Sequence, residues 1–250
     1  MAARSSRPSS RPVLSAEVLS IGTELTVGDT RDTNAGEIAR WLSRRGVAVG
    51  RLSALPDDLA AVQSAFADSL GRADLVVSTG GLGPTPDDLT REAIATAFRV
   101  EQEEVPEVAA DLRARFTRNP EYAARWALLP RASRPLANPH GGAPGFAIEN
   151  VYVLPGLPSE MEAMFASIEE ELRRGSPIQA WRRVYRTYES VIAETLAETA
   201  ERWPGILVGS YPSFSTEGST VEVVLKSSDA DALAAASAWL AAAIEESGRR

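Results

Sequence analysis

The fold is decided by one stretch, Asp74-Leu-Val-Val-Ser-Thr79-Gly-Gly-Leu-Gly-Pro-Thr-Pro-Asp-Asp-Leu-Thr90. Its first six residues contain the apolar run Leu75-Val-Val77, which predicts a short buried strand. Glycine and proline then interrupt the pattern over residues 80–88, which is typical of a loop. Helical spacing returns from Leu89 to Phe98. The stretch therefore predicts a strand that leads through a glycine-rich loop into a helix.

The residues before this stretch repeat the same order of elements. We expect strands over Ala16–Ile21 and Val47–Leu55, and helices over Ala35–Arg45 and from Pro56 to Gly71. Strands that alternate regularly with helices favour parallel pairing, because each helix carries the chain back across the sheet. The pattern predicts an α/β fold with a doubly wound, largely parallel sheet.

The pattern after Phe98 is less regular. Residues 101–131 have helical spacing with a break at Asn119-Pro120, and Phe146–Leu154 reads as a strand with a turn at Glu149-Asn150. A further helix begins at Glu160, and the hydroxyl of Ser159 is placed to cap it. We expect these elements to complete the same domain.

The pattern changes again from Trp181 onward. Two helices, over Val191–Arg202 and Asp229–Glu246, alternate with strands over Arg183–Tyr188, Ile206–Ser210 and Thr220–Lys226. This order predicts a small α+β unit rather than more of the parallel sheet. The expected organisation is a disordered tail over residues 1–13, an α/β domain over residues 14–175, and a small α+β subdomain over residues 178–250.

The composition narrows the possible chemistry. The 250 residues contain no cysteine and one histidine, and their formal net charge is −8. The lack of cysteine excludes disulfides and thiolate catalysis, and the acidic excess argues against nucleic-acid binding. No apolar run is long enough to span a membrane, and the Arg-, Ser- and Pro-rich start lacks the apolar core of a secretory signal. We expect a cytoplasmic protein that uses carboxylates, hydroxyls, backbone amides and a hard metal ion.

Polar loops follow three of the predicted strands, after Ile21, Leu55 and Thr79. In a parallel sheet these loops meet at the carboxyl edge, where ligands bind. Gly80, Gly81 and Gly83 have no side chains, so their peptide amides can approach a phosphate closely. Asp87 and Asp88 would repel that phosphate unless a cation such as Mg²⁺ lies between them. The alternative interpretation is a tight turn followed by acidic residues that cap a helix.

Several motifs, in a fixed order, resemble the amino-terminal domain of the CinA family (competence/damage-inducible protein A) and the wider MoaB/MogA molybdopterin-binding fold. The resemblance covers about residues 14–245 and extends, in the small C-terminal region, to a part of eukaryotic FAD synthase. It is carried by Gly22-Thr-Glu-Leu-Thr-Val-Gly28, Thr33-Asn34-Ala35, Pro56-Asp57, Thr79–Thr90, Gly142-Ala-Pro-Gly-Phe146, Leu154-Pro-Gly-Leu-Pro-Ser-Glu-Met161 and Gly209-Ser-Tyr-Pro-Ser-Phe214.

The resemblance implies a three-layer α/β/α domain that binds molybdopterin-like or adenine-nucleotide ligands. In CinA this domain is associated with ADP-ribose pyrophosphatase activity, and the related domain of FAD synthase with FAD hydrolysis. CinA proper also carries a carboxy-terminal NMN deamidase domain, which this sequence lacks, so we do not expect deamidase activity. A homo-oligomer is expected from the same resemblance.

The candidate site combines the predicted strand-end loops with the matching family motifs. Asp57 and Asp88 match two aspartates that matter in MogA-type sites, and Glu24 lies in the matching Gly-Thr-Glu loop. We expect these three carboxylates to be catalytic, and Asp57, Asp87 and Asp88 to hold Mg²⁺ or another divalent cation. The expected ligand-binding residues are Gly22, Thr23, Asn34, Thr79, Gly80, Gly81, Gly83, Pro84, Thr85, Thr90, Gly145, Gly156, Ser159 and Glu160.

Two functions fit these expectations. The first is a divalent-metal-dependent nucleotide pyrophosphatase that hydrolyses a dinucleotide such as ADP-ribose or FAD. The second is a protein of molybdenum cofactor metabolism that binds or adenylylates molybdopterin. Asn34 also has two possible roles, as a helix N-cap or as a ligand contact. A third alternative is a structural or regulatory domain that has the same fold but no catalytic activity. The presence of Asp57, Asp88 and the glycines counts against it.

Overall fold

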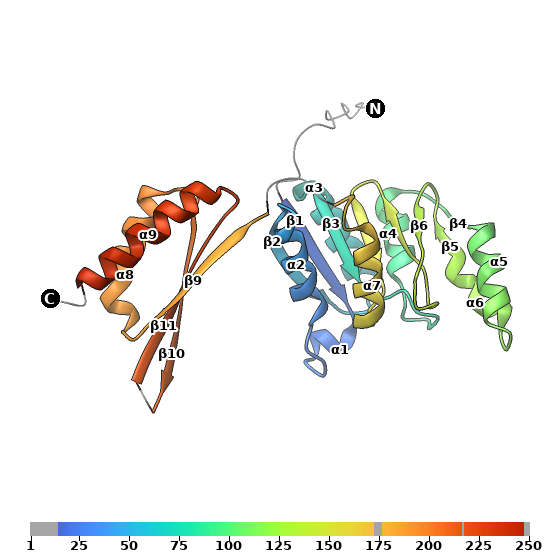
Figure 1. Ribbon diagram of the computed structural model, residues 1–250. Helices are drawn as coiled ribbons and strands as arrows, with labels where there is room; N and C mark the ends of the chain where they lie inside the picture. Colours follow the sequence, from blue (N-terminus) through green and yellow to red (C-terminus); the bar gives the residue numbers. More distant parts are fainter. Residues whose placement is uncertain (1–14, 173–176, 217, 248–250) are drawn as a thin grey trace. The chain divides into compact units, whose positions relative to one another are not determined.

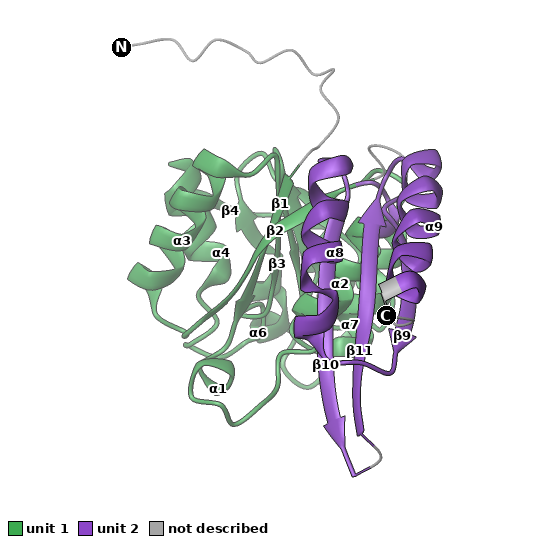
Figure 2. Cartoon of the chain, turned by 90° about the vertical axis from the view of Figure 1, so that its left-hand side faces the viewer, with its two compact units in different colours: residues 1–43, 47–174 green, residues 44–46, 175–250 purple. Residues whose placement is uncertain are grey.

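A computed structural model describes residues 15–172, 177–216 and 218–247. The predicted tail over residues 1–13 lies outside these residues. The chain divides into two compact units, residues 1–43 with 47–174 and residues 44–46 with 175–250 (Figure 2). Each unit has its own hydrophobic core. The larger unit carries the glycine-rich loop and is described first.

The larger unit is built on a six-stranded sheet with the order β2-β1-β3-β8-β7-β6. β2 pairs parallel with β1, β1 with β3, and β3 with β8, whereas β7 and β6 join antiparallel at the end. The turn between β7 and β8 lies at Glu149-Asn150, as predicted. The strands are β1 (Ser15–Ile21), β2 (Ala48–Leu55), β3 (Leu75–Thr79), β6 (Arg134–Leu136), β7 (Gly145–Ile148) and β8 (Val151–Leu154).

Helices cover both faces of this sheet (Figure 1). On one face, α2 (Asn34–Arg44) and α7 (Pro158–Ile168) pack their apolar side chains against Val18 and Val77. On the other face, α3 (Leu59–Arg72) and α4 (Thr90–Phe98) pack against strand residues such as Val76. Since both faces are covered, β3 and β8 are buried along their whole length and β1 from Ala16 onward. The predicted three-layer α/β/α fold is confirmed.

The prediction for residues 101–131 is wrong in part. They form β4 (Gln102–Glu104), α5 (Pro106–Arg115), α6 (Pro120–Ala124), the 3₁₀ helix η1 (Arg125–Ala127) and β5 (Leu128–Pro130). β4 pairs antiparallel with β5, a long-range contact that overrides the local helical spacing. Pro106 and Pro120 stand at the first positions of the two helices, where proline has no amide hydrogen to leave unpaired.

The smaller unit is a three-stranded antiparallel sheet with the order β10-β11-β9. β9 begins at Gln179, earlier than predicted, because it pairs along β11 as far as Ser227. Its core lies between the sheet and two helices and includes Leu196, Val223 and Leu240. The elements are β9 (Gln179–Tyr185), α8 (Glu189–Arg202), β10 (Leu207–Ser215), β11 (Gly218–Ser227) and α9 (Ala230–Ser247). The predicted small α+β region is confirmed.

No helix in the part of the chain that the structure describes is long and apolar enough to cross a membrane.

Candidate functional site

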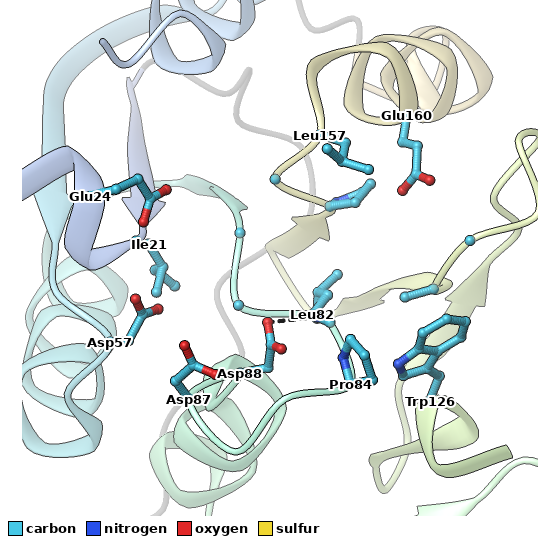
Figure 3. A pocket seen from close by; sticks show the side chains of 18 residues that line it. Ile21, Glu24, Asp57, Leu82, Pro84, Asp87, Asp88, Trp126, Leu157 and Glu160 are labelled. Atoms are coloured by element: carbon cyan, nitrogen blue, oxygen red, sulfur yellow. Dashed lines mark hydrogen bonds between the residues drawn. The ribbon is translucent and has the colours of Figure 1, made fainter. Parts of the chain in front are cut away.

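A cavity of about 460 Å³ lies at the carboxyl edge of the parallel strands, and we call it the acidic pocket (Figure 3). The loops after β1, β2 and β3 form it together with the loop that leads from β8 into α7. It therefore brings together residues that are far apart in the sequence. The predicted site residues that line it are Gly22, Glu24, Asp57, Gly80, Gly81, Gly83, Pro84, Asp87, Asp88, Gly156 and Glu160.

Other predicted site residues lie outside the lining of this pocket. Some of them make hydrogen bonds that hold the loops of the pocket in place, namely Thr23, Asn34, Thr79, Thr85 and Thr90. Gly145 lies in β7, where an added Cβ would come within 2.3 Å of the Val153 carbonyl oxygen. Its absent side chain thus serves the packing of the β7–β8 hairpin. Ser159 is exposed on the first turn of α7.

The acidic pocket is lined by five carboxylates, and no lysine, arginine or histidine is among its described lining residues. The carboxylates belong to Glu24, Asp57, Asp87, Asp88 and Glu160. Within residues 15–172, 177–216 and 218–247, no group of three or more acidic or histidine side chains forms a ready metal cage. A phosphate that enters this pocket needs a cation beside it to offset the surrounding negative charge.

The loops after β1 and β2 are tied together by Thr23 and Asp57. The backbone amide of Thr23 donates to Asp57 Oδ2 at 2.7 Å, and the backbone amide of Asp57 donates to Thr23 Oγ1 at 3.0 Å. The Glu24 carboxylate folds back over Gly22, where an added Cβ would lie only 2.4 Å from Glu24 Oε1. Glycine at position 22 therefore leaves room for the carboxylate.

Asp88 shapes the glycine-rich loop from inside. Its Oδ1 accepts from the Gly83 amide at 2.7 Å, and its Oδ2 accepts from the amide and the hydroxyl of Thr85 at 2.8 and 2.5 Å. Arg91 holds the other side of the loop, because its guanidinium donates to the carbonyl oxygens of Leu82 and Gly83. Burial holds the pKa of Arg91 below its ordinary value, and the nearby Asp88 carboxylate offsets this effect only in part. The loop is thus held by internal hydrogen bonds.

These bonds correct the expected phosphate cradle. Gly80 and Gly83 were expected to offer their amides to a phosphate, but they donate to the Leu154 carbonyl oxygen and to Asp88 instead. The amides of Gly81 and Leu82 have no acceptor within the described residues. Gly80 has φ +98°, and a Cβ there would lie 2.1 Å from the Ile21 carbonyl oxygen. A side chain at position 80 would therefore push the loop away from β1.

Gly81 and Thr90 fix the other end of the loop. Thr90 is buried, and its hydroxyl donates to the Gly80 carbonyl oxygen at 3.0 Å. Gly81 has φ +64°, and a Cβ there would lie 2.1 Å from Thr90 Oγ1. Thr90 thus positions the loop and does not line the pocket.

Asn34 links α2 to the ends of β3 and β8. Its Nδ2 donates to Thr79 Oγ1 at 3.0 Å and to the Gly156 carbonyl oxygen at 2.8 Å, and the Thr79 hydroxyl donates to Pro155. Asn34 is not the N-cap of α2, because the Ala35 amide donates to Asp32 instead. Asn34 Oδ1 is buried and has no partner in the described part of the chain. This side chain lines a smaller cavity of about 100 Å³.

The start of α7 faces the acidic pocket through Gly156, Leu157 and Glu160. Leu157 occupies the N-cap position and Pro158 follows it, so the predicted cap by Ser159 is wrong. Without a side-chain cap, the first turn keeps its positive end available to an anion. Glu160 accepts from Asn138 Nδ2 at 3.0 Å.

Two residues of the site were not predicted. Trp126 lines the acidic pocket from η1, in the segment 101–131 for which only helical spacing was predicted. Arg91 binds the loop carbonyls from the first turn of α4. The helical spacing of α4 places Arg91 near the loop, whereas no local pattern points to Trp126, which reaches the pocket through tertiary packing.

The fold and the pocket define an α/β protein with a small-molecule site at the carboxyl edge of a three-layer sheet. Residues 17–174 match the family model described as a probable molybdopterin binding domain. The chain belongs to this family. Residues 183–249 match a second model, the middle domain of FAD synthase.

Relatives with similar sequences include CinA-like proteins. One from Frankia casuarinae is 40% identical over 206 residues, which cover 75% of this chain and 48% of the relative. One from Deinococcus radiodurans is 38% identical and covers 94% of this chain and 60% of the relative. The chain thus spans about half the length of the Frankia relative.

A solved structure supports the same relationship. The CinA protein of Thermoplasma acidophilum is 36% identical, with a TM-score of 0.60, and the likeness covers 63% of this chain and 98% of that one. The predicted CinA-like, MoaB/MogA-type fold is confirmed. The family and the FAD synthase match indicate a phosphorylated or nucleotide-like small molecule as ligand.

Proposed function

We propose that the acidic pocket binds a phosphorylated, nucleotide-like molecule together with a divalent cation, and that the protein hydrolyses a pyrophosphate bond such as that of ADP-ribose or FAD. The observation that carries this proposal is the composition of the pocket. Five carboxylates stand around the free amides of Gly81 and Leu82 and the uncapped start of α7. The amides and the helix start attract a phosphate, whereas the carboxylates repel it. A divalent cation bound between the carboxylates and the phosphate would remove this repulsion.

The oxygen donors of the pocket suit Mg²⁺ or a similar hard ion. Mg²⁺ in nucleotide sites is held by one or two carboxylates, phosphate oxygens and several waters, so a cage of three protein ligands is not needed. Asp57 keeps Oδ1 free of protein partners within the described residues, whereas both oxygens of Asp88 are bonded to the loop. We therefore assign Asp57 and Asp87 to the cation and assign Asp88 to the shape of the loop.

The remaining groups would serve the reaction as follows. When bound, the cation would neutralise phosphate oxygens and stabilise the charge that develops on them. No hydrogen bond ties down the Glu24 carboxylate among the described residues, so it would orient a water molecule and accept its proton. The water oxygen bonds to one phosphorus, the bridging P–O bond breaks, and two phosphate monoesters leave. ADP-ribose would give AMP and ribose 5-phosphate.

A second function is favoured by the family match over residues 17–174. In this alternative, the same pocket holds a molybdopterin phosphate, and the protein binds or adenylylates it. A bound pterin that co-purifies with the protein would be visible by its fluorescence. Its presence, with no hydrolysis of ADP-ribose or FAD, would decide for this alternative.

The hydrolase is tested by Asp57→Asn, with Asp58→Asn as the matched control. Asp57→Asn removes the charge that faces the pocket and should lower Mg²⁺-dependent release of AMP from ADP-ribose by at least about 100-fold. Asp58 caps α3 by accepting from the Ala61 amide at 2.8 Å and does not line the pocket. Asparagine caps equally well, so Asp58→Asn should keep full activity. Unchanged turnover in Asp57→Asn would refute the assignment.

A further inference from the structure

A second cavity adjoins the acidic pocket on the side of α5 and α6. We call it the aromatic cavity, and its volume is about 450 Å³. Pro84 and Trp126 line both cavities. Figure 3 shows these two residues across the acidic pocket from Glu24 and Asp57. The two cavities therefore share a wall formed by these two residues, and a ligand that extends past this wall would place a different chemical group in each.

The linings of the two cavities are opposite in character. The acidic pocket has five carboxylates, whereas the described lining of the aromatic cavity contains two arginines and no acidic residue. Arg115 is ion-paired with Asp111, so Arg118 supplies the positive charge that is available to a ligand. The aromatic cavity also contains three aromatic rings, from Phe116, Tyr122 and Trp126. Aromatic faces with adjacent guanidinium groups favour planar, electron-rich rings. The aromatic cavity is thus unsuited to a metal ion and suited to a heterocycle.

The rings are held in place before any ligand binds. Phe116 and Trp126 meet edge to face, with centroids 5.1 Å apart and an interplanar angle of 89°. The Tyr122 hydroxyl donates to the Pro84 carbonyl oxygen, which ties α6 to the glycine-rich loop. The Arg125 guanidinium lies 5.4 Å from the centroid of the Tyr122 ring. Rings fixed in this way lose little freedom when they bind another ring.

Two polar groups around this cavity have no partner among the residues that the structure describes. Arg118 is exposed and makes no ion pair or hydrogen bond with any residue that the structure describes. The indole N–H of Trp126 is shielded from solvent and has no acceptor there either. Both groups are donors, and heterocyclic bases carry ring nitrogens and carbonyl oxygens that accept hydrogen bonds.

We infer that the aromatic cavity binds the fused heteroaromatic ring of the ligand whose phosphate binds in the acidic pocket. This inference rests on the proposed nucleotide-like ligand. It adds a base-recognition subsite in which Tyr122 and Trp126 contact the ring and Arg118 donates to its acceptor atoms. A cavity of this size is within the range of ligand sites in proteins.

The test compares AMP with ribose 5-phosphate, which shares the ribose and phosphate but has no base. Calorimetric titration in Mg²⁺ should show the wild-type protein binding AMP at least about tenfold more tightly. Arg118→Ala and Tyr122→Leu should each reduce this ratio to about threefold or less, because each removes a contact to the base. Tyr122→Phe loses only the hydroxyl bond to Pro84 and keeps the ring, so it should keep the preference for AMP. The affinity of Arg118→Ala for ribose 5-phosphate should stay within about twofold of wild type, because Arg118 does not line the acidic pocket. Any loss in Tyr122→Leu should not exceed that in Tyr122→Phe, which lacks the same bond to Pro84.

Arg40→Ala is the matched control, since Arg40 is an exposed arginine on α2 that lines neither cavity. It should keep the full preference for AMP. The subsite is overturned if wild type shows no preference, if Arg118→Ala and Tyr122→Leu both retain it, or if they weaken both ligands equally. Failure of the proposed function has a different signature. In that case ADP-ribose is not hydrolysed, while the preference for AMP and its loss in the two variants persist.

Discussion

Thr23 and Asp57 bind each other reciprocally, since each backbone amide donates to the side chain of the other, at 2.7 and 3.0 Å. Thr23 follows β1 and Asp57 follows β2, so the pair locks two strand-end loops together. It also fixes the Asp57 carboxylate before any ligand arrives. A site preorganised in this way needs less rearrangement when it binds a cation and a phosphate.

Thr23→Val should weaken this lock. Valine keeps the shape of threonine but removes the hydroxyl that accepts from the Asp57 amide. Loss of a group that orients a metal ligand costs about tenfold in metal affinity. We therefore expect the Mg²⁺ concentration needed for half-maximal AMP release to rise about tenfold, as measured by titrating the activity with Mg²⁺. Thr23→Ser retains the hydroxyl and should behave like wild type, and equal effects in the two variants would disprove the role of the hydroxyl.

Asp88→Ala should loosen the glycine-rich loop. The variant removes the acceptor of three hydrogen bonds from Gly83 and Thr85. A loss of about 2 kcal/mol of local stability corresponds to about 30-fold faster amide exchange. Hydrogen exchange of Gly83 and Thr85, followed by NMR, measures this directly. In Asp87→Ala, which removes the neighbouring carboxylate, these two amides should remain protected, and protection in both variants would show that Asp88 does not hold the loop.

Gly80→Ala should destabilise the larger unit. The position needs φ +98°, and the added Cβ would meet the Ile21 carbonyl oxygen. We expect a loss of more than about 2 kcal/mol in urea unfolding. Gly71 provides the control, since it lies in α3 with no heavy atom within 4 Å of an added Cβ. Gly71→Ala should stabilise the protein by about 0.5–1 kcal/mol. Equal stability of the two variants would contradict this argument.

Arg72→Met should make the free energy of unfolding depend less on pH in the acidic range. Glu17 is buried on β1 and accepts from Arg72 Nε at 2.9 Å and from Ser69 Oγ at 2.7 Å. The bond from Arg72 is the main cause that holds the pKa of Glu17 below its ordinary value of 4.5. The ion pair therefore adds stability above about pH 4.5, and this addition is lost as the pH falls through the lowered pKa.

We expect the unfolding midpoint of Arg72→Met to lie roughly 5 °C below wild type at pH 7. The difference should shrink steadily below pH 4.5, as Glu17 becomes protonated in both proteins. Thermal unfolding followed by circular dichroism between pH 3 and pH 7 covers this window. Arg40→Met removes an exposed pair on α2 and should change the midpoint little at any pH. A difference that stays constant with pH would exclude the Glu17 pair as its cause.

Much of the fold was predictable because local patterns and tertiary packing agree there. The apolar runs of β1 and β3 and the helical spacing of α2 and α3 each match the elements observed. Residues 101–131 are the exception. There β4 and β5 pair across more than 20 residues, and no short window of sequence contains that contact.

The sequence by itself determined that strand-end loops with Glu24, Asp57, Asp87 and Asp88 would share one edge of a parallel sheet, because strand direction alone places them there. The tertiary structure decided the role of each group. In the folded chain the Gly83 amide donates to Asp88 and so holds the glycine-rich loop, while the Gly81 amide has no acceptor among the described residues. Folding also places Trp126, from a distant helix, in the lining of the pocket. Hydrogen bonds form between atoms that meet in space, and their pairing is settled only when the chain has folded.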